Sequence, residues 1–230
     1  YPQGEDDIHV VFSTDCTSYQ MWQAVVLFHS AHLSGHKGPI TQLVSGCTKE
    51  EEEKVTSMHI KSRHSPLHRQ HFTPSYVMPG VEEHTMEELS YMNKPKAMWN
   101  WLQKVTTRET IIALVDPDFL FLKPLTTWLD PQKTAVQGDG LSLEGLGLER
   151  GEWVRKGFPA GQRFGLPNWT KWDLDKICPD ETACRDASTQ EARKYYDLIP
   201  PYLAHQEDWQ LLVPEWVDQA PKVRAAQVVF

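Results

Sequence analysis

An apolar segment that ends in two closely spaced aspartates constrains the fold of this chain more than any other feature. Residues 111–115 read Ile-Ile-Ala-Leu-Val, and Asp116-Pro117-Asp118 follows directly. A continuous run of β-branched and aliphatic residues is typical of a strand buried on both faces, in the middle of a mostly parallel sheet covered by helices. We therefore predict an α/β fold in which a central strand carries Asp116 and Asp118 to one edge of the sheet.

The spacing of the two aspartates predicts a metal site. Side chains at positions i and i+2 of an extended backbone point to the same side, and Pro117 restricts the backbone between Asp116 and Asp118. Carboxylate oxygens suit Mn²⁺ or Mg²⁺, which usually bind the phosphates of a substrate as well. The implied substrate is a nucleotide diphosphate. The competing interpretation is a surface turn with two solvated aspartates, because motifs this short recur by chance.

Length, charge and absent motifs narrow the class of protein. A chain of 230 residues, 40% of them hydrophobic, is enough for a single domain over residues 1–230 with a substantial core. The net charge of -8 argues against nucleic acid as a partner, since a basic stripe would be expected there. Neither a GxGxxG nor a P-loop motif occurs, which disfavours a dinucleotide enzyme or an NTPase. Because residue 1 is Tyr rather than Met, the sequence leaves open whether a targeting or membrane-anchoring segment precedes it in the full protein.

Strand and helix patterns alternate along the first half of the chain. Short β-branched and aliphatic runs predict strands, and apolar residues at helical spacing predict helices. Alternation of this kind, with sites at the carboxyl ends of the strands, is what an open nucleotide-binding sheet requires. The predicted strands cover residues 8–12, 40–44 and 111–115, the predicted helices cover 18–33 and 94–105, a short acidic helix includes 50–53, and residues 58–85 are expected to be irregular.

The four cysteines leave two interpretations open. Cys178 and Cys184 flank a short polar segment and are predicted to form a disulfide, whereas Cys16 and Cys47 each follow an apolar stretch and would meet if their strands are neighbours. The alternative is four buried thiols that act as small hydrophobic groups. A zinc site of the usual spacing is disfavoured, because no CxxC pair is present. A glycosylation sequon at Asn168 agrees with an oxidising, luminal compartment.

Two further groups of side chains have a functional and a structural interpretation. His64, His68 and His71 would share one face of a helix and bind zinc there, but Pro66 interrupts the segment, so a polar loop near the active site is the preferred interpretation. The tryptophans of the second half offer flat faces for sugar rings or prolines, although most of them are expected in the core. They are Trp128, Trp153, Trp169, Trp172, Trp209 and Trp216.

Several short motifs occur in the order found in one known family. They include His9-Val10-Val11-Phe12-Ser13-Thr14-Asp15-Cys16, Gly38-Pro39-Ile40-Thr41, Asn93-Lys94-Pro95, Asp116-Pro117-Asp118, Pro200-Pro201-Tyr202 and Glu207-Asp208-Trp209. With them the chain resembles the plant and algal peptidyl serine α-galactosyltransferases, and to a lesser extent the related hydroxyproline O-arabinosyltransferases. The resemblance covers most of the chain, and the first two motifs favour the serine galactosyltransferase branch.

The resemblance implies a GT-A-like, Rossmann-like fold that binds a nucleotide sugar, with Mn²⁺ held by Asp116 and Asp118. It implies a retaining, metal-dependent transfer of galactose from UDP-galactose to serine of hydroxyproline-rich proteins, in the lumen of the endoplasmic reticulum or Golgi. One alternative is a hydroxyproline O-arabinosyltransferase that uses UDP-arabinofuranose. Another is a non-catalytic domain that binds a nucleotide sugar or serves as a scaffold.

The residues expected to contact the donor lie at the ends of strands and at a helix start. Thr14, Asp15 and Ser45, at the ends of the first two predicted strands, would contact the base and ribose. Asn93 and Lys94 open the helix before the aspartates, where an ammonium and exposed N–H groups would both face the diphosphate. In the competing interpretation Lys94 is merely solvated.

The chain departs from the family pattern at its end. Members of the family continue beyond the segment that matches Pro214-Glu215-Trp216, whereas this chain ends at Phe230. We therefore expect a single GT-A-like domain that is incomplete at its C-terminal side. A third metal ligand and the catalytic residue are expected in that continuation, so the sequence offers no candidate for the catalytic residue.

Overall fold

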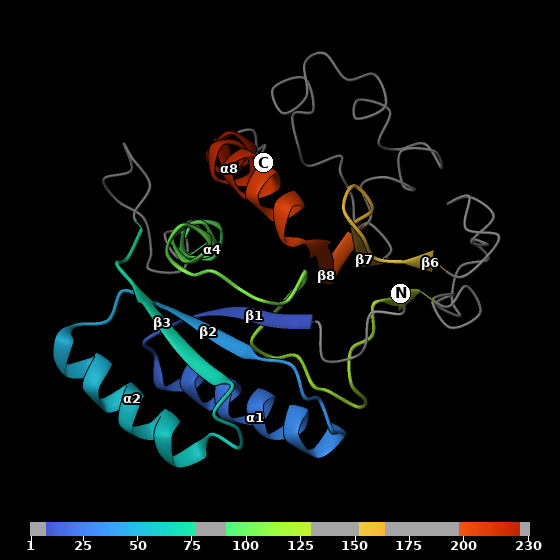
Figure 1. Cartoon of the computed structure of the whole chain (residues 1–230). Coiled ribbons are helices and arrows are strands. Elements are labelled where there is room, and N and C mark those ends of the chain that lie inside the picture. The colour runs from blue at the N-terminus through green and yellow to red at the C-terminus, as the bar shows by residue number, and fades with distance from the viewer. Residues whose placement is uncertain (1–7, 77–90, 130–151, 164–197, 226–230) are drawn as a thin grey trace.

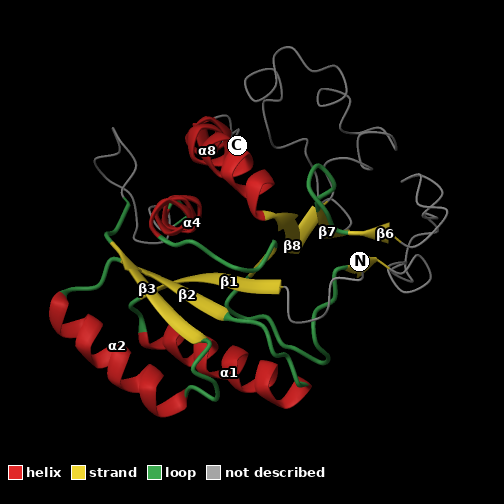
Figure 2. Ribbon diagram, in the orientation of Figure 1, coloured by secondary structure: helices red, strands yellow, loops and turns green. Residues whose placement is uncertain are grey.

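A six-stranded sheet with helices on both faces forms the centre of the protein (Figures 1 and 2). The computed structural model describes residues 8–76, 91–129, 152–163 and 198–225. Its elements in chain order are β1 (Ile8–Asp15), α1 (Ser18–Ser34), β2 (Ile40–Ser45), α2 (Lys49–Ser62), β3 (His68–Thr73), α4 (Asn93–Lys104), β4 (Ile111–Val115), β5 (Trp128–Leu129), β6 (Glu152–Trp153), β7 (Ala160–Arg163), β8 (Leu198–His205) and α8 (Gln206–Ala225).

The order of the strands is that of an open nucleotide-binding sheet. The sheet reads β3-β2-β1-β4-β8-β7; β1, β2, β3 and β4 are parallel to one another, while β8 runs antiparallel to both β4 and β7. An order of 3-2-1-4 is Rossmann-like, and ligands of such sheets bind outside the carboxyl ends of the strands where the order reverses. Here that point lies between β1 and β4. The predicted α/β class, with a central and mostly parallel sheet, is confirmed.

The central strand is buried on both faces, as predicted. All five residues of β4 are at most 1% exposed. Ile111, Ala113 and Val115 pack with α1 on one face, and Ile112 and Leu114 pack with α4 and α8 on the other. Complete burial of one aliphatic side chain of this size stabilises the fold by about 1.5–3 kcal/mol. The strand that leads to Asp116 is therefore held between two layers of helix. Figure 2 shows α1 and α2 on one side of the sheet and α4 and α8 on the other.

Local signals explain where the first two helices begin and end. Thr17 caps α1, and Gly35 ends it in the left-handed conformation, with a φ of 80°. Helix α2 begins with a capping box, in which Thr48 and Glu51 each accept a backbone N–H of the other. Hydrogen bonds from Thr48 lower the pKa of Glu51 below its usual value. The predicted acidic helix is thus confirmed, and it extends to Ser62.

The irregular segment expected over residues 58–85 is wrong in its first half. Residues up to Ser62 complete α2, and His68–Thr73 form β3, which pairs in parallel with β2. His64 lies in the turn between them, so the three histidines share neither a helix nor a loop. The His68 ring is buried and stacks on Phe28, with 4.7 Å between ring centroids. The strand forms because β2 offers a hydrogen-bonding edge, which the polar local sequence does not reveal.

Some predictions fall outside the part of the chain that the structure describes. These concern Cys178, Cys184 and the sequon at Asn168, all within residues 164–197. No helix in the described part combines the length and apolarity needed to cross a bilayer.

Candidate active site

Asp116 and Asp118 leave β4 at the point where ligands of such a sheet bind. The N–H of Phe119 donates to the carbonyl of Asp116 at 3.0 Å, so residues 116–119 form a turn with Pro117 at its second position. The extended backbone expected between the two aspartates is therefore wrong, because the strand ends at Val115. Asp118 is exposed, and the Asp116 side chain is 40% exposed. Both carboxylates are accessible to a ligand.

Lys94 connects the start of α4 with the end of β4. Its ammonium donates a hydrogen bond to Oδ1 of Asp116 and forms an ion pair with it. The Lys94 side chain is 31% exposed. Helix α4 has no side-chain cap, since Met92 at its N-cap makes no such hydrogen bond. The N-terminus of a helix attracts anions, and here it lies beside a cation and the Asp116 carboxylate at this edge of the sheet.

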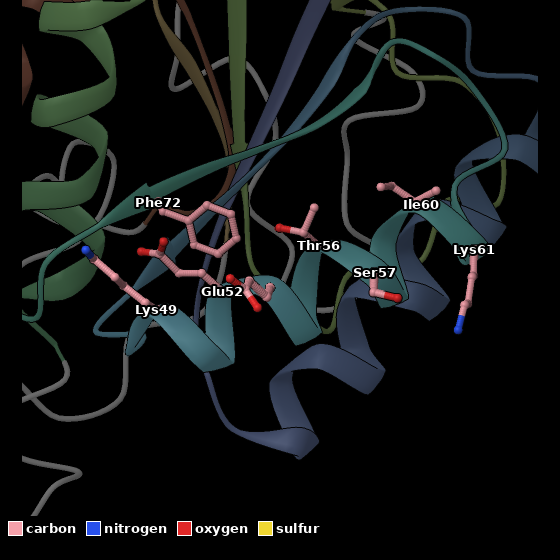
Figure 3. A pocket seen from close by; sticks show the side chains of 8 residues that line it. Lys49, Glu52, Thr56, Ser57, Ile60, Lys61 and Phe72 are labelled. Carbon is pink, nitrogen blue, oxygen red and sulfur yellow. The ribbon is translucent and has the colours of Figure 1, made fainter.

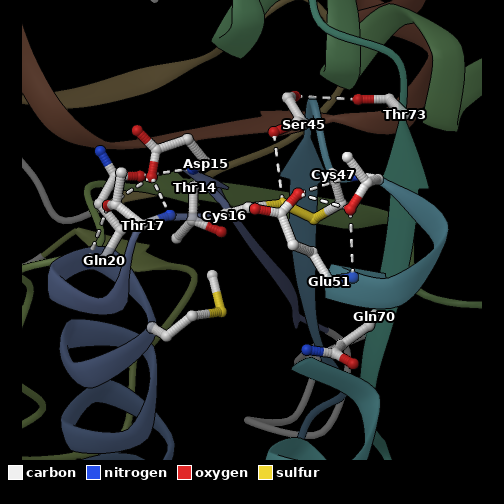
Figure 4. Close-up of a disulfide and its surroundings, with 12 residues drawn as sticks. Thr14, Asp15, Cys16, Thr17, Gln20, Ser45, Cys47, Glu51, Gln70 and Thr73 are labelled. Atoms are coloured by element: carbon white, nitrogen blue, oxygen red, sulfur yellow. Dashed lines mark hydrogen bonds between the residues drawn. A yellow bond between two sulfur atoms is a disulfide. The ribbon is translucent and has the colours of Figure 1, made fainter. Parts of the chain in front are cut away.

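Thr14 and Ser45 serve the sheet itself. The Thr14 hydroxyl accepts a hydrogen bond from Gln42 Nε2 at 3.0 Å. The hydroxyls of Ser45 and Thr73 are 2.9 Å apart (Figure 4). Thr14 is 2% exposed and Ser45 is 1% exposed. Both side chains therefore satisfy polar neighbours on adjacent strands. Their contact with the base and ribose stays a prediction.

Asp15 lies at the edge of the sheet and organises the start of α1. Its Oδ1 accepts hydrogen bonds from the Thr17 N–H at 2.8 Å and from the Thr17 hydroxyl at 2.6 Å, and its own N–H donates to Gln20 Oε1 at 2.6 Å (Figure 4). Asp15 is opposite Ser45 in the pairing of β1 with β2. The structure thus brings the ends of the first two strands together, as expected, with Asp15 the more accessible of the pair.

Asn93 faces the neighbouring loop. Its side chain is largely buried, and Oδ1 accepts the Tyr76 N–H at 2.9 Å. The bond fastens the segment after β3 to the first turn of α4, which carries Lys94. In this arrangement Asn93 positions the helix start, while its predicted contact with the donor stays a prediction.

A disulfide joins the segments that follow β1 and β2. Cys16 and Cys47 are bonded, with their Cα atoms 5.4 Å apart (Figure 4). The sequence allowed this pairing if the two strands were neighbours, and their parallel pairing makes them so. The bond restrains two segments at the edge where the aspartates lie. Disulfides of this kind persist in oxidising compartments.

Tyr202 is a residue of this site that the sequence-based assignment missed. It lies on β8 opposite Leu114 of β4, and Asp116 follows Leu114 by two residues. Burial raises the pKa of the Tyr202 hydroxyl, and the negative charge of Asp116 raises it further. The motif Pro200-Pro201-Tyr202 was visible in the sequence. Its place beside β4 was not, because an antiparallel neighbour is set by the tertiary fold.

A hollow along α2 lies apart from these residues. It has a volume of about 590 Å³ and is lined by Phe72 of β3 and by α2 residues that include Lys49, Glu52 and Lys61 (Figure 3). Side chains of both charges line it without convergence on one point. In the described part of the chain, no group of three or more His, Cys, Asp or Glu side chains is arranged to hold a metal.

Comparisons with known proteins give the chain its relatives. It is 31% identical over 123 residues to a peptidyl serine alpha-galactosyltransferase of Arabidopsis thaliana, covering 53% of this chain and 14% of that protein. It is 25% identical over 119 residues to the protein of the same name from Chlamydomonas reinhardtii, covering 51% of this chain and 14% of that protein. The chain therefore spans about one seventh of the length of these relatives.

A solved structure and a family model complete the comparison. The galactosyltransferase LgtC, in complex with donor and acceptor sugar analogues, is similar over 94% of this chain and 66% of its own, with 13% identity and a TM-score of 0.43. The model of the hydroxyproline O-arabinosyltransferase family N-terminal domain matches residues 8–138. This match takes in more than half of the chain, including Lys94, Asp116 and Asp118. The chain belongs to the hydroxyproline O-arabinosyltransferase family.

Proposed function

We propose that this chain carries the donor-binding part of a metal-dependent, retaining glycosyltransferase. In this proposal galactose moves from UDP-galactose to serine of a hydroxyproline-rich protein in the lumen of the endoplasmic reticulum or Golgi. The observation that carries the proposal is the ion pair of Lys94 with Asp116, beside Asp118, at the carboxyl edge of the sheet where the strand order reverses between β1 and β4. The names of the two relatives support the transfer of galactose to serine, and the Cys16–Cys47 disulfide supports an oxidising compartment.

The residues present fit a divalent cation bound together with a diphosphate. Asp116 and Asp118 offer accessible carboxylate oxygens, which are hard ligands suited to Mn²⁺ or Mg²⁺. Such cations usually keep positions for phosphate oxygens and water, so two protein ligands are sufficient. When bound, the cation would neutralise negative charge on the leaving diphosphate.

Lys94 would take a second role at the diphosphate. In the free protein its ammonium is held by Asp116. If Asp116 held a cation, the Lys94 ammonium would be available to a phosphate oxygen of the donor. The uncapped N–H groups at the start of α4 lie in the same turn of the helix. These preorganised positive groups would stabilise charge that develops on the leaving group.

The remaining donor contacts would come from the ends of β1 and β2. Asp15 is the only one of Thr14, Asp15 and Ser45 that is not buried, so it is the first candidate for a ribose hydroxyl. Thr14 links β1 to β2 through Gln42, and Ser45 links β2 to β3 through Thr73, so the two side chains would hold the strand ends in register.

A second function is favoured by the family match. The matching family is named for hydroxyproline O-arabinosyltransferases, which indicates arabinose as the transferred sugar and hydroxyproline as the acceptor. In this second function the donor would be UDP-arabinofuranose. Both functions require the same metal and diphosphate site. A non-catalytic domain would bind the nucleotide sugar without turnover.

A transfer assay separates these possibilities. The chain is incubated with Mn²⁺, one UDP-sugar at a time and a peptide that contains serine and hydroxyproline, and the peptide is analysed by mass spectrometry. Our proposal predicts the mass of one hexose on serine with UDP-galactose. A pentose on hydroxyproline with UDP-arabinofuranose would establish the second function. Tight Mn²⁺-dependent UDP binding with no modified peptide for any donor would instead identify a binding domain.

A further inference from the structure

An apolar hollow lies between the sheet and α8, apart from the aspartates and Lys94. Its volume is about 390 Å³. Leu114 and Tyr202 line it from β4 and β8, Pro159 lines it from the residue before β7, and Leu212 and Trp216 line it from α8. Figure 1 shows α8 lying over the face of the sheet beside α4. None of the proposed donor contacts belongs to its lining.

The floor of the hollow is rigid and its rim is open. Leu114 is 1% exposed, and Trp209 is fixed by a 2.9 Å hydrogen bond from its Nε1–H to the carbonyl of Ile112. Tyr202 and Trp216 are only partly buried, and Leu212 is 47% exposed. A ligand would thus meet preformed walls and cover apolar surface that now faces solvent, which favours binding.

The lining matches proline rings better than sugars. Aromatic side chains with an adjacent proline and leucine offer flat apolar walls and few polar groups, and the Trp209 N–H is already used by Ile112. Proline-rich segments dock in aromatic-lined grooves because the polyproline II helix is extended and loses little entropy on binding. A sugar ring would need several hydrogen-bonding partners, which this lining does not supply.

The charge beside the hollow indicates a basic ligand. Glu215 is exposed on α8, three residues after Leu212 and next to Trp216, and it has no ion-pair partner within the described part of the chain. Residues three apart on a helix lie on the same side, so the carboxylate is at the rim. The whole chain has a net charge of -8. A peptide with lysine next to its prolines would complement both the apolar walls and the carboxylate.

The position of the hollow connects it with the candidate active site. Tyr202 lines the hollow and lies within the electrostatic influence of Asp116, which is two residues beyond its strand partner Leu114. A peptide seated in the hollow would therefore pass beside the donor site. Resting on the function proposed above, we infer that this hollow, lined by Tyr202, Leu212 and Trp216, binds the acceptor as a basic, hydroxyproline-rich peptide in the polyproline II conformation.

The test uses the whole chain and two fluorescently labelled peptides. One is a short polyhydroxyproline peptide with serine and lysine at its ends, and the other has alanine in place of every hydroxyproline. Leu212→Asn alters the rim, and Leu211→Asn is its matched control, because Leu211 is 71% exposed and does not line the hollow. Fluorescence anisotropy gives peptide affinity, and calorimetry with Mn²⁺ and UDP gives donor affinity on the same samples.

We expect the hydroxyproline peptide to bind the parent chain and Leu211→Asn equally, and Leu212→Asn roughly tenfold or more weakly. The alanine peptide should bind neither the parent chain nor either leucine variant. Glu215→Gln, which leaves the hollow intact, should weaken binding of the lysine-containing peptide and reduce its dependence on salt. UDP affinity should be the same in all variants. Since Leu212 and Glu215 are at the surface, these proteins are expected to fold as the parent does.

Three results would overturn the inference. The first is UDP binding without peptide binding, which leaves the donor site intact and removes the hollow from the acceptor path. The second is equal peptide affinity for Leu212→Asn and Leu211→Asn. The third is a dimer in sedimentation velocity that Leu212→Asn dissociates, which would assign the hollow to a second copy of the chain. Peptide binding that depends on Leu212 without any UDP binding would support the hollow and contradict the proposed function alone.

Discussion

The ammonium of Lys94, in the first turn of α4, forms an ion pair with the carboxylate of Asp116 at the end of β4. The side chains are 31% and 40% exposed, and ion pairs with that much access to water contribute only about 0–1 kcal/mol to stability. The pair therefore explains little of why the fold is stable. Its place at the carboxyl edge of the sheet makes a role in binding the better explanation.

Replacement of Lys94 by alanine should weaken nucleotide binding with little effect on folding. A hydrogen bond from an ammonium to a phosphate is worth roughly 1–3 kcal/mol, so the free energy of UDP binding in Mn²⁺ should become less favourable by that amount. Lys104→Ala is the matched control, because Lys104 is an exposed lysine in the last turn of the same helix. Calorimetry and thermal unfolding measure the two effects. Equal UDP affinity for the two variants would remove Lys94 from the donor site.

Loss of the Cys16–Cys47 disulfide should destabilise the chain. The two cysteines are 31 residues apart, and closure of a loop of that length stabilises a fold by about 3–4 kcal/mol in the chain-entropy model. The variant with serine at both positions should therefore unfold at a lower urea concentration than the oxidised parent. A parent protein whose urea midpoint equals that of the variant would show that the bond contributes nothing.

The chain should lose stability as the pH falls from about 6.5 towards 4, in part because of His68. Burial, together with the positive charges of nearby histidines, lowers the pKa of His68 to about 4. The unfolded chain, with a histidine pKa near 6.5, then binds more protons than the folded chain in this interval, so stability rises with pH there. The contribution of His68 lost by pH 5 is about 2 kcal/mol.

His68→Phe tests this directly, because phenylalanine keeps a ring that can stack on Phe28 but does not titrate. Urea unfolding at pH 7 and pH 5 should show a smaller drop in the free energy of unfolding for the variant than for the parent. His9, whose pKa burial lowers to about 4 while Glu109 opposes the shift, continues to contribute in both proteins. The assignment to His68 fails if the two drops are the same size.

The N-terminal elements were predictable because their signals are local. The run 111–115 predicts a strand buried on both faces, and apolar residues at helical spacing predict a helix over residues 18–33, where the structure has α1. The parallel strand and the helices that pack beside it give the fold its α/β class. The edge on which Asp116 lies then follows from the direction of parallel strands.

Other features depend on contacts between distant parts of the chain. Strand β3 is polar in sequence and exists because β2 pairs with it. Tyr202 reaches the neighbourhood of Asp116 only because β8 runs antiparallel to β4. The turn at residues 116–119 replaced the extended backbone that was expected, since Pro117 suits a turn as well as a strand end. Such features are set by tertiary pairing, which the periodicity of one segment does not reveal.

The most direct test of the central claim is the calorimetric titration of UDP into the chain with and without Mn²⁺. The parent, Asp116→Asn, Asp118→Asn and the doubly substituted chain are compared, with Asp218→Asn as control, since Asp218 pairs with Lys222 on α8. Our account predicts UDP binding that requires Mn²⁺ in the parent and the control and that is lost when both Asp116 and Asp118 are replaced. Unchanged Mn²⁺-dependent binding in the doubly substituted chain would contradict it.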